Sequence, residues 1–418
     1  MSDPNTLSPS ALSTVLIHHP YQAPAGFEAP QQPVHKASTV LFPDVAAVRS
    51  RRWLDKSSYT YGLHGTPTSF VLEERLCALE GARQCLLVPS GLSALSTVSM
   101  ALLSAGDEVL LPDNAYGPNK DFAQVELARW GITHRFYDPM SVDDLRAKMG
   151  AQTRLVWLEA AGSVTMEFPD LLAQVRLCKE RGVVCALDNT WGAGLAFAPF
   201  DLLRDGGSLG VDVSVHALTK YPSGGGDVLM GSITTCDQAL HMRIKLCHMR
   251  LGLGVGANDV ELVLRSLPSI ALRYHAQDRT ARTLAQALQR QSAVVQVLHP
   301  ALAGAPGHAH WQQVCGAAQN GQGAAAGIFS FVVDARFDQD AVDAFCNRLR
   351  WFRLGYSWGG HMSLVMPYDL DDMRHCGRGA VAAGRLVRLC IGLEDAADLE
   401  RDLAQAYEAA FGCAWMAA

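Results

Sequence analysis

The stretch "QCLLVPSGLSALSTVSMALLSAGDEVLLPD", residues 84–113, places a longer run of small and apolar residues between two short apolar runs. The short runs have the length of buried strands, and the run between them has the length of a helix. Residues 84–106 carry no charge, so a membrane span is the competing interpretation, but a Pro-Ser-Gly turn interrupts them. We therefore interpret the stretch as strand, turn, helix and strand.

The same alternation continues along the chain. The segments 153–161 ("TRLVWLEAA"), 182–189 ("GVVCALDN") and 211–218 ("VDVSVHAL") are further apolar strand candidates, and helical segments or loops separate them. Strands that alternate with helices indicate an α/β fold with a mainly parallel sheet, covered by helices on both faces.

Three regions follow from the change of pattern along the chain. Residues 1–65 are rich in proline, which predicts an extended arm with little regular structure that reaches a neighbouring subunit. Residues 66–268 form the α/β domain. In residues 269–418 a long helical pattern, a Gly- and Ala-rich loop at 304–327 and the strand candidates 328–333 and 386–393 predict a smaller α+β domain.

The composition favours a compact enzyme that acts on a small molecule. Charged residues make up 18% of the 418 residues, hydrophobic ones make up 49%, and the formal net charge is -6. No lysine-arginine stripe suggests a nucleic-acid or anionic-membrane surface. The 11 cysteines lack a C-x-x-C pair, which favours reduced thiols over disulfides or a zinc site. The first residues resemble neither a secretory nor a transit signal, so we expect a cytoplasmic protein.

Polar residues follow three predicted strands, where ligands of parallel sheets bind. Ser90, Gly91 and Leu92 begin a helix whose N–H groups could hold a phosphate, although small residues begin many helices. Asp188 ends a strand, either as a helix cap or as the partner of a cation. Lys220 precedes a Ser-Gly-Gly-Gly run and is either a surface charge or an amine suited to covalent chemistry.

Together these three strand ends predict a pyridoxal 5'-phosphate site. The helix would bind the phosphate, the aspartate the pyridinium nitrogen, and the lysine the aldehyde. A dinucleotide site at the glycine-rich residues 251–256 is disfavoured, because a basic helical segment precedes them and the G-x-G-x-x-G spacing is absent.

Eight motifs, in this order and spacing, resemble the Cys/Met-metabolism family of pyridoxal-phosphate enzymes from about residue 35 to the end of the chain. They are "YGLHGTPT" (61–68), "PSGLSA" (89–94), "NAYGP" (114–118), "LEAAGSVTMEF" (158–168), "LDNTWGAG" (187–194), "ALTKY" (217–221), "YSWGG" (356–360) and "RLCIGLED" (388–395). The resemblance implies the type I fold of aspartate aminotransferase. The tryptophan of "SWGG" and the segment "GSVTMEF" most resemble the bacterial cystathionine β-lyase branch.

For the cofactor, the resemblance implies that Lys220 holds the aldehyde covalently and that Asp188 binds the pyridine nitrogen. Tyr116 would stack on the ring, although without the resemblance a core tyrosine is the favoured interpretation. Gly91 and Leu92 would donate backbone N–H groups to the phosphate. Thr219 would add a hydroxyl, and Tyr61 would reach the phosphate from the adjacent subunit, which implies a homo-oligomer, as a dimer of dimers.

For the substrate, the resemblance implies that Arg388 binds the carboxylate, with Ser357 holding the lysine or the carboxylate and Trp358 beside them. Without the resemblance, Arg388 would be a surface strand residue. The implied reaction is β-elimination of L-cystathionine to homocysteine, pyruvate and ammonia. The alternatives are a γ-lyase or γ-synthase, a broad C–S lyase of cysteine conjugates, and a cofactor-binding regulatory protein with little turnover.

The chain departs from the family pattern at several positions. Leu63, followed by His64, stands where the family often has an arginine that binds the phosphate. The other departures are Ala160, Ala161, Ala217, Gly225 and Gly226. None removes Lys220, Asp188 or Arg388, so we expect the cofactor chemistry to survive, whereas the resemblance determines the choice of substrate less firmly.

Overall fold

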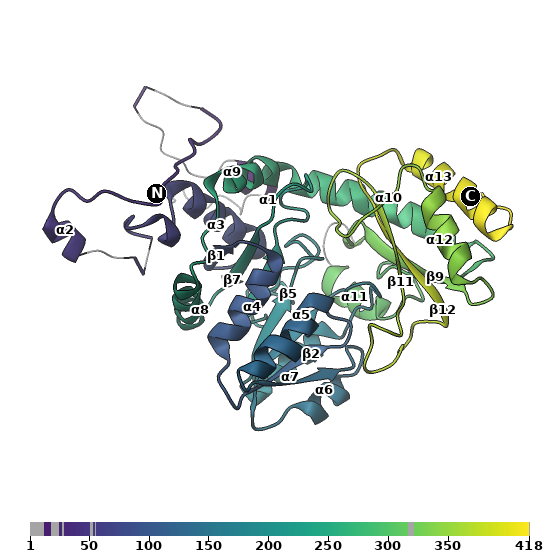
Figure 1. Cartoon of the computed structure of the whole chain (residues 1–418), viewed down its shortest axis with the longest axis horizontal. Helices are drawn as coiled ribbons and strands as arrows, with labels where there is room; N and C mark the ends of the chain where they lie inside the picture. Colours follow the sequence, from purple (N-terminus) through teal and green to yellow (C-terminus); the bar gives the residue numbers. More distant parts are fainter. Residues whose placement is uncertain are drawn as a thin grey trace, which may run out of the picture.

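The computed structural model describes residues 12–17, 25–26, 29–50, 53–54, 56–316 and 322–417. A seven-stranded sheet forms the larger part of the molecule, in the order β1-β7-β6-β5-β4-β2-β3 (Figure 1). Only β7 runs against the others, because it pairs antiparallel with both β1 and β6. The predicted α/β fold with a mainly parallel sheet is confirmed. The strands are β1 (Gln84–Val88), β2 (Glu108–Pro112), β3 (Thr133–Tyr137), β4 (Thr153–Glu159), β5 (Val184–Asp188), β6 (Val213–Ala217) and β7 (Gly231–Thr235).

Helices cover both faces of this sheet, as the alternation of side chains along the strands shows. In β1, Cys85 and Leu87 belong to one buried apolar cluster, whereas Leu86 and Val88 belong to another. The helices of this part are α3 (Pro67–Glu80), α4 (Gly91–Leu102), α5 (Gly117–Phe122), which continues as η2 (Ala123–Leu127), α6 (Val142–Lys148), α7 (Leu171–Arg181), α8 (Gln238–Leu251) and α9 (Ala257–Ser266).

Residues 84–106 form the predicted strand, turn and helix, β1 followed by α4. Within the described part of the chain, no helix combines the length and the apolar character that crossing a bilayer requires.

A five-stranded sheet follows in the order β10-β11-β12-β9-β8, and it is antiparallel except for the pair β10 and β11. Its strands are β8 (Val294–Leu298), β9 (Ile328–Asp334), β10 (Arg353–Leu354), β11 (Leu364–Tyr368) and β12 (Gly384–Cys390), and its helices are α10 (Ile270–Gln289), α11 (His308–Cys315), α12 (Gln339–Arg348) and α13 (Ala396–Phe411). The boundary that we propose at residue 268 falls in the short helix η3 (Leu267–Ser269), just before α10.

One prediction about an irregular segment was wrong. The Gly- and Ala-rich stretch 304–327 contains α11, which the buried side chains of Trp311 and Cys315 anchor; residues 317–321 of this stretch lie outside the described residues. The predicted arm contains two short helices, α1 (Leu12–Ile17) and α2 (Val45–Arg49). Leu16 of α1 is buried in the core. Residues 1–11, 18–24, 27–28, 51–52 and 55 of the arm lie outside the described residues.

The segment that carries α2 extends away from the rest of the chain (Figure 1). Large apolar side chains are exposed along it, and Leu41, with 89% of its surface accessible, is the most exposed of them. The others are Val34, Val45, Val48, Leu54, Tyr59 and Tyr61.

Candidate active site

A cavity of about 150 Å³ lies at the carboxyl ends of β4, β5 and β6, beside the start of α4. Parallel strands leave their carboxyl ends at one edge of a sheet, so the residues after them meet there. Eight of the ten predicted site residues line this cavity: Gly91, Leu92, Tyr116, Asp188, Thr219, Lys220, Trp358 and Arg388. A ninth, Ser357, contacts Lys220 directly.

Lys220 lies in the turn after β6, and its amine contacts two consecutive residues, Ser357 and Trp358, in the loop before β11. Its Nζ is 3.0 Å from Ser357 Oγ and 4.5 Å from the centre of the Trp358 ring. Burial, followed by the positive charge of Arg388, lowers the pKa of Lys220 from 10.5 to about 8. A substantial fraction of this amine is therefore neutral near pH 8, which suits attack on an aldehyde.

Asp188 ends β5, where Thr190 fixes one of its oxygens. Oδ1 accepts hydrogen bonds from Thr190 N at 3.0 Å and from Thr190 Oγ1 at 2.6 Å. Burial raises the pKa of Asp188, while the Thr190 bonds and the charge of Lys220 oppose that change. Both hydrogen bonds end on Oδ1, so Oδ2 can accept a hydrogen bond from an N–H group of a ligand.

Glu159 is a site residue that the sequence interpretation missed. It ends β4 directly opposite Asp188 of β5, and it lines the same cavity. Its oxygens accept hydrogen bonds from Tyr116 N and Ser163 N, each at 2.9 Å. Burial and the neighbouring Asp188 raise the pKa of Glu159. The strand-end rule that identified Asp188 applies equally to Glu159 and could have found it.

The start of α4 presents backbone N–H groups to the cavity. Ser90 caps the helix by accepting a bond from Ser93 N at 3.0 Å. A β-carbon at Gly91 would lie 2.6 Å from Ala217 Cβ, so only glycine fits between α4 and β6. Thr219 lines the cavity too, and its hydroxyl lies 3.3 Å from Met230 N.

Arg388 projects from β12 and is almost completely buried. Its guanidinium carbon lies 5.6 Å from the Trp358 ring centre and 5.0 Å from that of Tyr368. Among the described residues its Nε has no hydrogen-bond partner. Because an unpaired N–H group in a buried guanidinium is costly, this arginine is suited to an anionic ligand.

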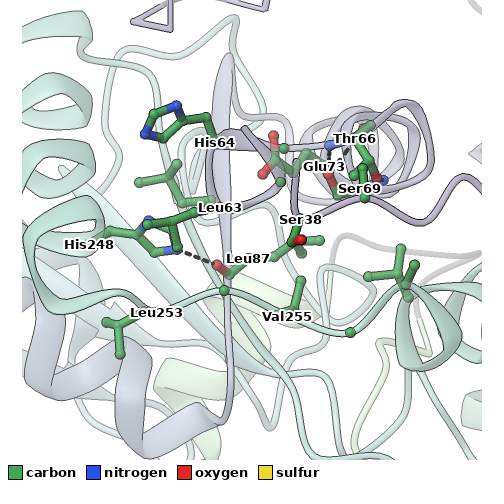
Figure 2. A pocket seen from close by; sticks show the side chains of 18 of the residues that line it. Ser38, Leu63, His64, Thr66, Ser69, Glu73, Leu87, His248, Leu253 and Val255 are labelled. Carbon is green, nitrogen blue, oxygen red and sulfur yellow. Dashed lines mark hydrogen bonds between the residues drawn. The ribbon is translucent and has the colours of Figure 1, made fainter. Parts of the chain in front are cut away.

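Tyr61 does not line this cavity. It forms an isolated bridge with Thr39 of the arm, and 47% of its surface is exposed. Leu63 and His64, which follow shortly after Tyr61, line a different cavity of about 530 Å³ (Figure 2). His248 lines the same cavity, and its Nε2 lies 3.0 Å from Leu87 O. The two cavities share no lining residue.

The glycines after Lys220 have neighbours other than this lysine. A β-carbon at Gly224 would lie 2.3 Å from Arg273 Nη1, and one at Gly225 would lie 2.3 Å from Asp227 Oδ1. Gly226 has open space around it but a φ of +74°, which favours glycine. Gly224 has a positive φ too, of +65°, so the backbone conformation explains the glycines at 224 and 226.

The donors and acceptors of the cavity fit pyridoxal phosphate. They include an amine with a lowered pKa, a carboxylate with an available oxygen, and a helix start kept free of a side chain at Gly91. Nε1 of Trp191, Nε1 of Trp358 and Nε of Arg388 are buried there without a hydrogen-bond partner among the described residues.

Comparison with known proteins agrees with this geometry. The family described as Cys/Met metabolism PLP-dependent enzyme matches residues 13–408. A cystathionine beta-lyase of Bordetella avium is 36% identical over 98% of this chain and 100% of its own length. An L-alanine/L-glutamate racemase of Wolbachia pipientis is 32% identical over 89% of this chain and 90% of its own. The crystal structure of metB from Corynebacterium glutamicum superposes with a TM-score of 0.84 at 26% identity, covering 98% of this chain and 100% of that one.

Proposed function

The chain belongs to the Cys/Met metabolism family of pyridoxal-phosphate-dependent enzymes, and from this premise we propose that it is a cystathionine β-lyase. The reaction converts L-cystathionine and water into L-homocysteine, pyruvate and ammonia. The observation that carries the proposal is the shared cavity of Lys220, Trp358 and Arg388. It places a proton-accepting amine beside a cation suited to a substrate carboxylate, with an indole ring within reach of both.

Pyridoxal phosphate, when bound, withdraws electrons from the substrate Cα and so makes loss of its proton feasible. In this chain Asp188 would bind the ring nitrogen, while the start of α4 and Thr219 would hold the phosphate. Arg388 would bind the substrate carboxylate, and Ser357 would keep the Lys220 amine in reach of Cα. Tyr116, which burial keeps protonated by raising its pKa, would pack against the ring.

The proton and electron transfers follow from these positions. Lys220 Nζ would take the proton from Cα. The Cα–H electron pair would form a Cα–Cβ double bond, and the Cβ–S pair would leave on sulfur as the homocysteine thiolate. Addition of water to the remaining three-carbon fragment would then yield pyruvate and ammonia.

The experiment that tests the proposal is product analysis with purified protein and added cofactor. L-cystathionine should give pyruvate and a free thiol in equal amounts. Cysteine with 2-oxobutyrate would instead identify a γ-lyase, and D-alanine formed from L-alanine would identify a racemase. Comparing kcat/KM for L-cystathionine, L-cystine and other cysteine conjugates would separate a dedicated enzyme from a broad C–S lyase.

We also propose that the enzyme is a cytoplasmic homo-oligomer, with a dimer of dimers as the expected assembly. Tyr61 would complete the phosphate site of a neighbouring subunit. The exposed apolar side chains of the arm support this proposal, since a chain that presents them to water gains by covering them.

A further inference from the structure

The connection between β11 and β12, residues 369–383, carries a buried arginine that contacts two acids of the large domain. Arg374 Nε lies 3.2 Å from Asp113 Oδ2, and its Nη1 lies 2.7 Å from Glu167 Oε2. The side chain of Arg374 is only 4% exposed, and both carboxylates are completely buried. A single planar guanidinium therefore joins two segments that are more than fifty residues apart in the sequence of the large domain.

Both acids belong to loops that form walls of the Lys220 cavity. Asp113 follows β2, and the cavity-lining Tyr116 comes three residues later. Glu167 directly follows Met166, which also lines the cavity. Glu167 Oε2 in addition accepts a bond from Asn114 Nδ2 at 3.2 Å, so the two loops are joined to each other as well.

The backbone of the connection also forms hydrogen bonds with Asp113. Asp113 accepts hydrogen bonds from His375 N at 2.8 Å and from Cys376 N at 2.6 Å. Lys120 Nζ donates to Asp113 Oδ1 at 3.2 Å and to Met373 O at 2.6 Å. Burial opposes ionisation of Asp113, but these hydrogen bonds and the charge of Lys120 outweigh it and lower its pKa to about 2.

The four charges of this cluster balance, which allows them to remain buried. Asp113 and Glu167 are the acids, and Lys120 and Arg374 are the cations. The connection leads directly into β12, which carries Arg388. Where the connection docks on the large domain therefore affects where Arg388 lies relative to Tyr116 and Lys220.

We propose that Arg374 is a positioning residue, which holds the Tyr116 loop and the Glu167 loop in register with the strand that carries Arg388. The proposal rests on the proposed function for the role of Arg388, and it assigns Arg374 no contact with substrate or cofactor. Its loss would misalign the carboxylate-binding group with the cofactor-facing groups.

The test compares Arg374→Lys with Arg378→Lys. Arg378 lies in the same connection and also contacts a carboxylate with two nitrogens, Asp371 at 2.8 Å each. That pair is more exposed, at 28% and 68% for the two side chains, and neither residue lines the cavity. Lysine keeps the charge in both variants but cannot contact two carboxylates in the planar geometry of a guanidinium.

We expect Arg374→Lys to raise both the Kd for pyridoxal phosphate, titrated into the apo protein, and the KM for L-cystathionine about tenfold. Arg378→Lys should stay within about twofold of the wild type in both values, because its pair with Asp371 is partly exposed and its other bonds, to Ala382 O and Gly384 O, stay within the connection and the start of β12 without reaching Asp113 or Glu167. KM separates positioning from stability, because its value does not depend on how many sites are folded. A purely structural defect lowers the maximal rate in proportion to the number of folded sites and leaves KM unchanged.

Values of Kd and KM for a folded Arg374→Lys that match those of Arg378→Lys would overturn the proposal. If Arg374→Lys fails to fold, the double variant Arg374→Gln/Glu167→Gln takes its place, since it removes one buried charge of each sign. Its Kd and KM are then compared with those of Arg378→Lys in the same way. A wild type that releases no pyruvate from L-cystathionine would refute the proposed function, whereas the Kd for pyridoxal phosphate would still test Arg374.

Discussion

Arg388 lies in the same cavity as Lys220 and close to the rings of Trp358 and Tyr368. A substitution of Arg388 alone can test whether its guanidinium binds the substrate carboxylate. A guanidinium matches a carboxylate with two parallel hydrogen bonds, whereas an ammonium keeps the charge and loses that fit. Each charge-assisted bond contributes about 1.5–3 kcal/mol. Single substitutions can therefore separate the substrate role that we propose for Arg388 from the cofactor roles that we propose for Asp188 and Lys220.

Arg388→Lys should lower kcat/KM for L-cystathionine about ten- to hundredfold and leave the visible spectrum of the bound cofactor unchanged. Asp188→Ala should instead weaken cofactor retention, because it removes the carboxylate that we propose as the partner of the ring nitrogen. Steady-state kinetics and absorbance spectra of the two variants check this contrast. A normal kcat/KM for Arg388→Lys would show that another group binds the carboxylate.

The lowered pKa of Lys220 predicts how cofactor uptake depends on pH. Only the neutral amine attacks an aldehyde, so the rate of uptake by the apo protein should rise with pH through a midpoint at about 8 and then level off. Removing the charge in Arg388→Met should move the midpoint to higher pH, because a nearby cation lowers the pKa of a lysine. Stopped-flow absorbance measures the rates. A midpoint near the ordinary lysine value of 10.5 in the wild type would contradict burial of this amine.

At the scale of elements, the position of the start of α4 depends on how closely Gly91 can approach Ala217 of β6. Gly91→Ala would place a methyl group 2.6 Å from Ala217 Cβ, so the helix start must shift away from the site that we propose for the phosphate. We expect the affinity for pyridoxal phosphate to fall at least about tenfold, since the backbone N–H groups would be misplaced.

The matched control for this helix is Gly256→Ala at the start of α9, where a β-carbon meets its nearest neighbour, Asp259 Oδ2, at an ordinary 3.8 Å. Equilibrium titration of the apo proteins with cofactor compares the two variants. Equal affinities would mean that the start of α4 does not hold the phosphate.

Two strands of the large sheet that the sequence interpretation missed, β3 and β7, share a physical cause. The edge strand β3 reads "THRFY" and is partly exposed, so it lacks the apolar run of a buried strand. The strand β7 reads "GSITT" and is buried because it pairs with β1 on one side and β6 on the other. In both cases the neighbouring strands, rather than the local pattern, determine the structure.

At the scale of the whole molecule, Tyr61 is the predicted site residue that neither lines the cavity nor contacts Lys220. It lies in the arm, whose exposed apolar side chains suggest a surface that a second copy of the chain covers. Assembly can therefore be tested by combining defects from two chains.

Tyr61→Ala and Lys220→Ala should each be nearly inactive, and exchange of subunits between them should restore activity. A mixed pair has one site with an intact Tyr61 and an intact Lys220, so equal mixing should recover up to about a quarter of the wild-type rate. Activity of the mixture, with size-exclusion chromatography of each protein, checks this. An active wild-type monomer would show that Tyr61 acts within its own chain or not at all.

The amino-acid sequence by itself determined the α/β fold and the chemistry at the strand ends. Apolar periodicity, short turns and the residue that follows a strand are local properties, so Gly91, Asp188 and Lys220 could be identified without coordinates. The resemblance left open whether Ser357 holds the lysine or the carboxylate, and only the tertiary structure, with the two residues 137 positions apart, shows its contact with the Lys220 amine. Only the tertiary structure likewise decided that Glu159 holds the backbone of Tyr116 and that Arg374 joins two loops of the large domain. These contacts arise where distant segments pack together, and their distances depend on the packing of both domains rather than on any local pattern.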